Sequence, residues 1–155
     1  MTKKKKQIQS VRVENKKARF DYAIDETYEA GIALQGAEVK SIREGKANLR
    51  DSFVRMKEGE AFLHNMYIAA YTFSSDLKYE ETRVRKLLLH KQELIKIGIK
   101  IKEKGFTLVP LKVYFKRGKA KVLIALAKGK KSFDKRETLK KRTQDREVRR
   151  EMARQ

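Results

Sequence analysis

The stretch Phe106-Thr-Leu-Val-Pro-Leu-Lys-Val-Tyr-Phe115 is joined by Lys116-Arg-Gly-Lys119 to a second run, Lys121-Val-Leu-Ile-Ala-Leu126. Both runs are rich in aliphatic and β-branched residues, and the glycine-bearing connection between them is typical of a β-hairpin. Pro110 has no N–H to donate to a neighbouring strand, so an edge or a bulge is expected there. The stretch therefore predicts a pair of antiparallel strands.

A second hairpin is predicted upstream, where residues 51–56 and 61–68 flank Lys57-Glu-Gly-Glu60. Nearer the N-terminus, apolar and polar residues alternate over 20–24, and an extended run follows over 28–34. These two runs predict a pair of strands, with a bulge at the glycine inside the second.

Helical spacing is seen in two places. A short helix is predicted just before Gly45, which is placed to end it. The stretch 94–104 is ambiguous, because its isoleucines alternate with lysine and glycine as in a strand, whereas Leu94, Ile97 and Ile101 share one helical face. Periodicity alone favours a strand in this stretch.

These elements suit one hydrophobic core and hence one domain. We predict a mainly β protein with helices, namely a small antiparallel barrel of the oligonucleotide-binding (OB-like) type with two or three helices and a basic C-terminal tail. The predicted boundaries are a basic N-terminal segment over 1–14, the barrel over 15–128 and the tail over 129–155.

Charge is concentrated at the two ends of the chain. Lys and Arg number 40 against 20 Asp and Glu, a net charge of +20. Residues 1–19 hold eight basic and one acidic side chain, and 128–155 hold twelve and five, so each end carries +7 and only +6 is left for the residues between. Blocks of like charge attract phosphate in a salt-sensitive way, so nucleic acid is the expected partner.

Other classes of protein fit this composition less well. The sequence has no run of roughly 20 apolar residues that could span a bilayer, and no apolar segment follows the N-terminal lysines. It has no cysteine, which excludes disulfides and thiolate metal sites and fits a cytoplasmic location. We therefore expect no membrane association, metal or cofactor.

Five blocks of sequence give a more specific indication, and they run in order from about Asn15 to Arg136. They are Glu29-Ala-Gly-Ile-Ala-Leu-Gln-Gly-Ala-Glu-Val-Lys-Ser-Ile-Arg43, Asn48-Leu-Arg-Asp-Ser-Phe53, Arg85-Lys-Leu-Leu-Leu-His-Lys91, Thr107-Leu-Val-Pro-Leu-Lys112, and Ala125-Leu-Ala-Lys-Gly-Lys-Lys131 followed by Asp134-Lys-Arg136. In these blocks the chain resembles the SsrA-binding protein family, the bacterial small protein B. The resemblance covers most of the chain.

The resemblance implies an OB-like barrel with helical additions, including a helix near 91–104, against the periodicity. It also implies a non-enzymatic RNA-binding adaptor of trans-translation. Such an adaptor binds the tRNA-like part of transfer-messenger RNA (tmRNA) as a monomer in a 1:1 complex. It delivers that RNA to stalled ribosomes and places its C-terminal tail in the empty mRNA channel, against small-subunit rRNA at the decoding centre.

Within the barrel, the resemblance implies that Asn15, Glu29, Leu88 and Lys121 contact the RNA. Lys121 would meet phosphate, Leu88 would lie beneath a base or ribose, and Glu29 would accept hydrogen bonds from base amino or imino groups. The residues alone leave other roles open. Glu29 would then pair with a lysine across strands, Leu88 would belong to the core, and Asn15 would be a turn residue.

In the tail, the resemblance points to a set of residues at the decoding centre: Lys130, Lys131, Phe133, Asp134, Lys135 and Arg136. Phe133 is a ring in a cationic segment and could stack on a nucleobase. The family often has His or Tyr there, so any role for a polar ring atom is lost. Asp134 and Glu137 have capping-box spacing for a helix start. We expect the tail to be disordered when free and helical on the ribosome.

Two other interpretations remain at this point. One is a general ribosome-associated or single-strand RNA-binding OB protein, which would need no defined tail. The other is a metal-dependent nuclease built on Glu29, Asp51 and His64.

Overall fold

The computed structural model describes residues 12–73, 78–103, 105–130 and 132–154. Within these residues the strands are β1 (Val13–Glu14), β2 (Tyr22–Ile32), β3 (Ala47–Asn48), β4 (Phe53–Lys57), β5 (Glu60–His64), β6 (Tyr67–Ile68), β7 (Arg85–Leu88), β8 (Phe106–Lys116) and β9 (Lys119–Gly129). The helices are α1 (Lys16–Asp21), α2 (Gly36–Arg43), α3 (Lys91–Lys102) and α4 (Ser132–Arg154). The predicted mainly β class with several helices is confirmed.

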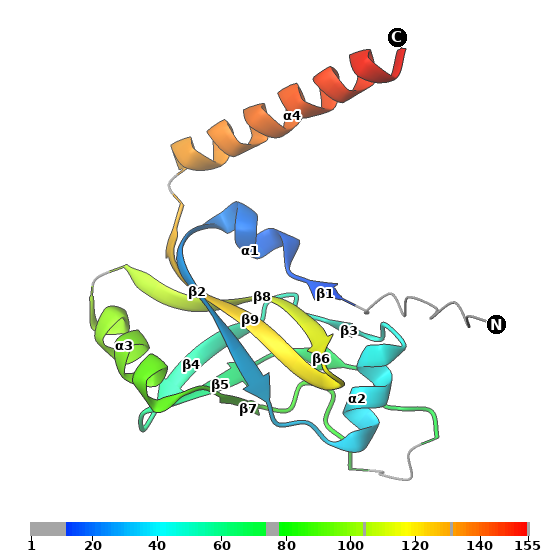
Figure 1. Ribbon diagram of the computed structural model, residues 1–155, viewed down its shortest axis with the longest axis vertical. Coiled ribbons are helices and arrows are strands. Elements are labelled where there is room, and N and C mark those ends of the chain that lie inside the picture. The colour runs from blue at the N-terminus through cyan, green and yellow to red at the C-terminus, as the bar shows by residue number, and fades with distance from the viewer. Residues whose placement is uncertain (1–11, 74–77, 104, 131, 155) are drawn as a thin grey trace, which may run out of the picture.

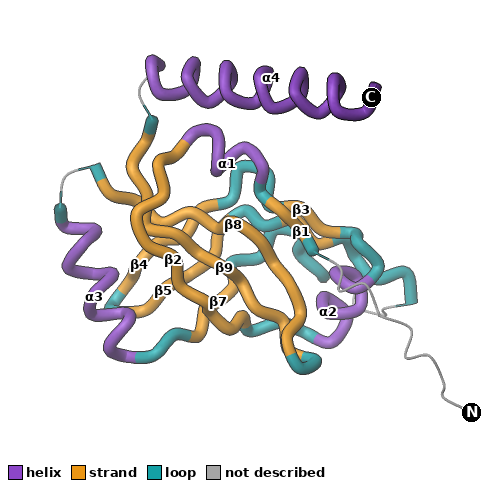
Figure 2. Tube along the Cα trace, turned by 45° about the horizontal axis from the view of Figure 1, so that its top comes forward, coloured by secondary structure: helices purple, strands orange, loops and turns teal. Residues whose placement is uncertain are grey.

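The main sheet closes on itself. Its strands follow the order β1-β8-β4-β5-β7-β2-β9, all pairings are antiparallel, and β9 pairs in turn with β8. Because β8 is long, it pairs with β9 along one side and with both β4 and β1 on the other (Figure 1). Figure 2 shows the strands wrapped around a common interior, with α1, α2 and α3 placed around the outside. The predicted OB-like barrel agrees with this architecture.

Both predicted hairpins are confirmed, and their turns are tighter than the sequence indicated. The central residues have positive φ angles in each turn, 52° and 76° at Glu58 and Gly59, and again 52° and 76° at Arg117 and Gly118. Such turns match the twist of the strands that they join. The bulge expected at Pro110 is also present, as a shift in the β8–β9 register directly after it.

The prediction for the first strands is wrong in two respects. Residues 22–32 form one continuous strand, β2, instead of two paired strands. Its bulge lies between Ile24 and Glu26, whereas Gly31 is regularly paired on both sides, with Leu88 and with Lys121. A bulge adds local bending and twist, and here it lies in the part of β2 that pairs only with β9.

The stretch 94–104 is helical over most of its length, so periodicity alone was misleading and the helix implied by the resemblance is confirmed. Ile97 is fully buried, and Leu94 and Ile101 pack against the same core. Ile95 and Ile99 are 54% and 60% exposed. In a strand all of these isoleucines would lie on one face. The observed burial therefore follows the helical period and not the alternation of apolar and polar residues.

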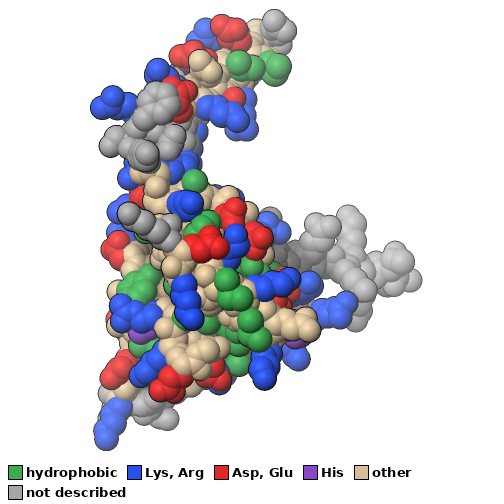
Figure 3. All heavy atoms as spheres, turned by 90° about the vertical axis from the view of Figure 1, so that its left-hand side faces the viewer, with side chains coloured by type: hydrophobic (Ala, Val, Ile, Leu, Met, Phe, Trp, Pro, Cys, Tyr) green, Lys and Arg blue, Asp and Glu red, His purple; other side chains and the backbone are tan. Residues whose placement is uncertain are grey.

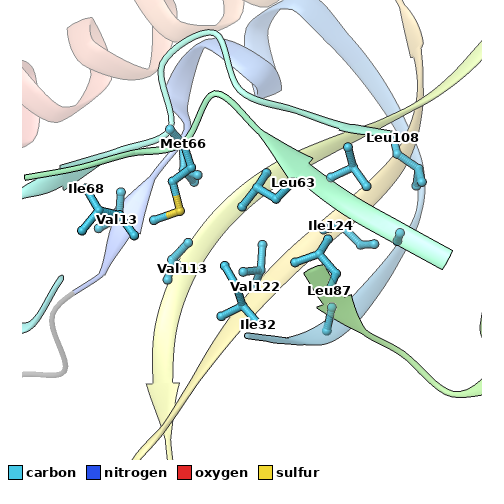
Figure 4. Packing of buried hydrophobic residues seen from close by; sticks show 14 of the residues in the cluster. Val13, Ile32, Leu63, Met66, Ile68, Leu87, Leu108, Val113, Val122 and Ile124 are labelled. Carbon is cyan, nitrogen blue, oxygen red and sulfur yellow. The ribbon is translucent and has the colours of Figure 1, made fainter. Parts of the chain in front are cut away.

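The core fills the barrel interior. Ala30, Val113 and Val122, which are cross-strand partners, are fully buried there, and Figure 4 shows the neighbouring aliphatic side chains converging from the surrounding strands. A smaller apolar cluster lies on the outside of the barrel and includes Ala18 of α1 with residues of β8 and β9. The short helix α1, which the sequence did not predict, therefore covers one end of the outer surface.

Candidate nucleic-acid interface

A strip of mixed polar and apolar residues crosses the outer face of four strands. Cross-strand pairing aligns one row across β8, β9, β2 and β7, consisting of Tyr114, Lys121, Gly31 and Leu88. The adjacent row consists of Lys112, Leu123 and Glu29. Side chains alternate along a strand, and the residues between these rows are buried inside the barrel, so both rows face outward.

Three of the predicted RNA-contacting residues line one pocket of about 760 Å³ on this strip, namely Glu29, Leu88 and Lys121. Its other walls come from strands, from Val39 of α2 and from the start of α3, where His90 lies. Leu88 is 54% exposed, so it belongs to the surface and not to the core. The residues alone favour a core role for Leu88, and the structure places it on the surface instead.

Gly31 lies next to Leu88 in this pocket, where a side chain on residue 31 would be crowded. A Cβ atom at this position would lie 3.2 Å from the Cβ of Leu88, closer than side chains usually pack. A larger residue would therefore push against the apolar wall of the pocket.

Glu29 is held in place by its neighbours. The hydroxyl of Tyr114 donates a hydrogen bond to Oε2, and the Nζ of Lys116 lies 3.4 Å from Oε1. The Tyr114 hydrogen bond, followed by the nearby lysines, lowers the pKa of Glu29. Burial and the same carboxylate raise the pKa of Tyr114 to about 12. The carboxylate is thus ionised and oriented, and the expected cross-strand pairing with a lysine is present together with the position in the pocket.

A cationic rim surrounds this carboxylate at the tip of the β8–β9 hairpin. Lys116, Arg117, Lys119 and Lys121 line a small depression together with Glu29. Backbone phosphates could approach along this rim, while the single carboxylate gives direction within it.

Asn15 lies elsewhere and has a structural role. Its Oδ1 accepts from the N–H of Ala18 at 3.2 Å, which caps α1, and its Nδ2 donates to the carbonyl of Pro110 at 2.9 Å. It lines shallow depressions near α1 and not the pocket with Glu29. Its contact with RNA stays a prediction, and the alternative of a turn residue before the first strand is wrong, because Asn15 follows β1 and caps α1.

A buried ion pair joins two of the elements that line the pocket. The carboxylate of Glu38, on α2, accepts from Arg85 Nε at 2.6 Å and from Arg83 at 2.5 Å, and Glu38 and Arg85 are fully buried. Burial acts to raise the pKa of Glu38, but the N–H of Gln35 and the two guanidinium groups lower it on balance. Arg85 also donates to the Met66 carbonyl at 2.7 Å. The pair fixes α2 against β7, and each of these elements supplies a wall of the pocket.

The tail forms α4, which begins at Ser132 and not at Asp134 as the capping-box spacing indicated. Leu139, Val148 and Met152 are more than half exposed, and on the face seen in Figure 3 the coloured side chains of this helix are mostly charged. Of the predicted tail residues, Lys130 donates its N–H to the Asp21 carbonyl, and Arg136 is exposed. Lys131 and the side chains of Phe133 and Asp134 lie outside the described residues.

Two described side chains in the first half of α4 contact the body. Lys135 Nζ lies 3.2 Å from Oδ1 of Asp21 and 5.8 Å from the ring centre of Phe20. The guanidinium of Arg142 lies 5.8 Å from the same ring. Both acceptors belong to α1, so α1 is the platform on which the tail begins.

Two of the three residues of the nuclease interpretation have separate partners, and the third, Asp51, lines depressions near α1. Glu29 contacts Tyr114 and Lys116, while His64 stacks on Phe53 with ring centres 5.0 Å apart. Over the described ranges, His, Asp and Glu side chains form no group of three or more that could hold a metal ion. Over the same ranges no helix has the length and apolar character to cross a membrane.

The fold and the strip define a class: a small OB-like barrel that carries a basic outer face with one pocket and a cationic helical extension. The chain belongs to the SmpB protein family, whose model matches residues 12–154.

Similar proteins agree with this assignment. The SsrA-binding protein of Sulfurihydrogenibium sp. (strain YO3AOP1) is 60% identical over 134 residues, which cover 86% of this chain and 88% of that protein. The SsrA-binding protein of Staphylococcus carnosus (strain TM300) is 50% identical over 152 residues, covering 98% and 97%. A chain in a solved structure described as "tmRNA-SmpB: a journey to the center of the bacterial ribosome" is 55% identical, with a TM-score of 0.66, over 79% of this chain and 86% of that chain.

Proposed function

We propose that this protein is the RNA-binding adaptor of trans-translation: it binds the tRNA-like domain of tmRNA and delivers it to stalled ribosomes. The observation that carries the proposal is the family membership over 12–154, together with the similarity to a chain of a tmRNA–SmpB ribosome structure. The adaptor catalyses no reaction; its task is to bring two RNAs together.

The barrel face supplies the grip on tmRNA. Lys121 and the rest of the cationic rim bind phosphate, Leu88 offers an apolar surface to a base or ribose, and the oriented carboxylate of Glu29 gives direction. Unstacked loop bases and 2′-hydroxyls are what RNA-binding proteins recognise, and a pocket beside a cationic rim suits such a loop.

The tail supplies the contact with the ribosome. Its helix has exposed cations on all sides and apolar residues too scattered to form a stripe, so it gains more from rRNA phosphates than from the barrel. We assign it to the empty mRNA channel, where Lys130, Lys131, Phe133, Asp134, Lys135 and Arg136 would lie closest to the decoding centre. Lys135 would then exchange Asp21 for rRNA.

A complementation experiment tests the proposal. The chain is expressed in bacterial cells that lack their own SsrA-binding protein, and tagging of peptides on a message without a stop codon is measured. The expected result is restored tagging, with purified protein binding tmRNA more tightly than a size-matched unrelated RNA at physiological salt. Binding of both RNAs with equal affinity, without restored tagging, would instead indicate a general RNA-binding OB protein.

A further inference from the structure

An apolar groove of about 870 Å³ lies between α3 and the turn of the β4–β5 hairpin. Its floor consists of half-buried side chains that also pack against the barrel core, namely Met56, Leu89, Leu94 and Ile101. In Figure 3, which shows the side of the molecule on which α3 lies in Figure 1, hydrophobic side chains gather between charged ones. An exposed apolar patch with a polar rim is typical of an interaction site.

The outer edge of α3 forms one wall of this groove. Lys91, Ile95, Ile99 and Lys102 follow one another at spacings of four, four and three residues, so they lie on a single stripe of the helix. The two isoleucines at its centre are more than half exposed. The stripe therefore presents an apolar centre between two cations.

Gly98 lies beside these isoleucines, and the described structure gives no internal reason for a glycine there. Its φ angle is not positive, and a Cβ atom on it would meet nothing within 4 Å. Glycine inside a helix is destabilising relative to alanine. A reason outside the chain is the close approach of a second backbone, which a residue without a side chain permits.

The opposite wall of the groove is acidic. Glu58 and Glu60 border it at the hairpin turn, and the carboxylate of Glu60 also lies 3.1 Å from Nζ of Lys86. Carboxylates repel RNA phosphates, and none of the described residues that line the groove is an aromatic ring on which a base could stack. This surface therefore suits a protein better than RNA.

The shape and charge of the groove also distinguish between protein occupants. Two copies of this chain would bring two hollow surfaces together, and each copy carries a net charge of +20. A convex apolar ridge between an acidic and a basic flank fits the hollow and both of its walls. An amphipathic helix has this form, and such helices bind apolar grooves through side chains at three- and four-residue spacing.

We propose that the groove between α3 and the β4–β5 turn docks an amphipathic helix of a partner protein. Its apolar side chains pack on Ile95 and Ile99, and its backbone passes close to Gly98. Its acidic flank faces the lysines of α3, and its basic flank faces the glutamates of the turn. Leu89 lines both this groove and the pocket on the strip, so the partner binds beside tmRNA and does not compete with it.

Photocrosslinking in the native bacterium tests the proposal. The photoreactive residue p-benzoylphenylalanine replaces Ile99 in the full chain, or Val84 in a matched control, which is 46% exposed but lies outside the groove. Adducts are mapped by mass spectrometry. We expect the Ile99 position, and not the Val84 position, to crosslink to one protein, within a segment that has apolar residues at helical spacing and an acidic flank.

Three results would overturn the proposal. The first is a set of Ile99 adducts no different from those of the Val84 control. The second is an adduct that nuclease removes, which would assign the groove to RNA. The third is an adduct of twice the mass of the chain, which would assign it to a second copy.

A synthetic peptide with the sequence of the crosslinked segment is then titrated with purified full-length chain by fluorescence anisotropy. Ile99→Lys and Gly98→Leu should each weaken binding by about 10-fold or more, because both residues lie at the centre of the groove. Val84→Lys and Gly36→Leu should leave it unchanged; Gly36 begins α2, and a Cβ there also meets nothing within 4 Å. Equal peptide affinity in all four variants would place the helix elsewhere.

Binding of tmRNA separates this inference from the proposed function. All four variants should retain tmRNA affinity, and the peptide should bind the tmRNA complex as tightly as the free chain. Loss of tmRNA affinity in Ile99→Lys and Gly98→Leu, but not in the two controls, would overturn the inference. If wild-type protein fails to bind tmRNA, the proposed function fails, whereas the peptide measurements on the free chain still stand.

Discussion

The barrel strip and helix α4 are both basic, but they are built in opposite ways. On the strip, two of the candidate RNA-binding side chains lie against neighbours: Glu29 contacts Tyr114 and Lys116, and Leu88 lies close over Gly31. On α4, the described side chains beyond Arg142 are exposed throughout, and Lys135 and Arg142 of the preceding turns contact the body. The strip is organised before RNA arrives, whereas α4 is largely left without tertiary partners.

This difference matches what each region has to recognise. A preorganised site loses little entropy on binding and can discriminate between bases, which suits a defined RNA loop. A cationic segment without a core of its own binds phosphates wherever they are dense and can follow a channel. The packing of each region therefore agrees with the proposed separation of RNA recognition from tail insertion.

Removing the tail should have the largest effect and should affect only one of the two roles. Because β9 ends at Gly129 and Lys130 is tied to Asp21, a stop after Lys130 leaves the barrel complete. We expect unchanged thermal unfolding, a modest loss of tmRNA affinity from the lost charge, and complete loss of tagging on stalled ribosomes. Calorimetry, filter binding and a tagging assay measure the three quantities.

A chain with a scrambled tail of the same composition is the control for charge. It should restore the tmRNA affinity but not the tagging. Tagging by the scrambled chain would mean that positive charge alone suffices, and the residues assigned to the decoding centre would lose their role.

Breaking the buried ion pair should have the next largest effect, on the barrel alone. Arg85→Leu leaves Glu38 buried with only Arg83 and the Gln35 N–H, and removing one partner of a buried pair typically costs about 3–5 kcal/mol. Urea unfolding should show a loss at the lower end of this range, because Arg83 remains. The double variant Arg85→Leu, Glu38→Gln should recover part of it.

The same pair gives a pH dependence with a defined sign. The folded-state pKa of Glu38 is lowered below 4.5, so its contribution to stability is present above pH 4.5 and is lost as the pH falls through the folded value. The stability difference between wild type and Arg85→Leu should therefore shrink in acid. A difference that stays constant down to the acid transition would show that the pair contributes through packing only.

Local patterns predicted a large part of the fold. The two hairpins, the short helix ended by Gly45 and the bulge at Pro110 could be read from glycine placement, β-branched runs and the missing proline N–H. The helix α3 could not be predicted from local pattern. Its isoleucines fit both a strand and a helix, and only the packing against the core distinguishes the two. The helix α1 lacks an apolar stripe and owes its place to Asn15 and to Ala18 beneath it.

The residues of the candidate site also fall into those that the sequence predicted and those that it did not. Glu29, Leu88 and Lys121 were predicted through the family resemblance, and the structure brings them to one pocket. Tyr114 and Gly31 were missed, because their importance depends on cross-strand register, and a bulge on β2 and another on β8 shift that register. Lys116 and Arg117 could have been noticed as charges at a hairpin tip.

A substitution at Gly31 should have a smaller effect, and it tests whether the strip is organised before RNA binds. In Gly31→Ala the new Cβ meets Leu88 at 3.2 Å, so Leu88 must shift by a few tenths of an ångström. We expect roughly a 5-fold loss of tmRNA affinity, about 1 kcal/mol, as for mild overpacking, with almost unchanged stability. Filter binding and urea unfolding report the two effects separately.

Gly98→Ala is the matched control, because a Cβ at Gly98 meets nothing within 4 Å in α3. It should raise stability by about 0.5–1 kcal/mol through helix propensity and leave tmRNA affinity unchanged. Equal affinity losses in the two variants would argue that the pocket tolerates movement and is not preorganised.

The smallest expected effect concerns the platform between the two regions. Phe20→Ala removes the ring under Lys135 and Arg142, and exposed cation–π contacts contribute about 0.5–1 kcal/mol each. An isolated helix of this length is marginal in water, so in wild type the amides of 132–142 should show slightly slower hydrogen exchange than those of 146–154. Phe20→Ala should abolish that difference without changing tmRNA affinity. Strong protection along all of α4 in the free wild-type chain would contradict a tail that orders on the ribosome, and would make α1 and α4 one packed unit.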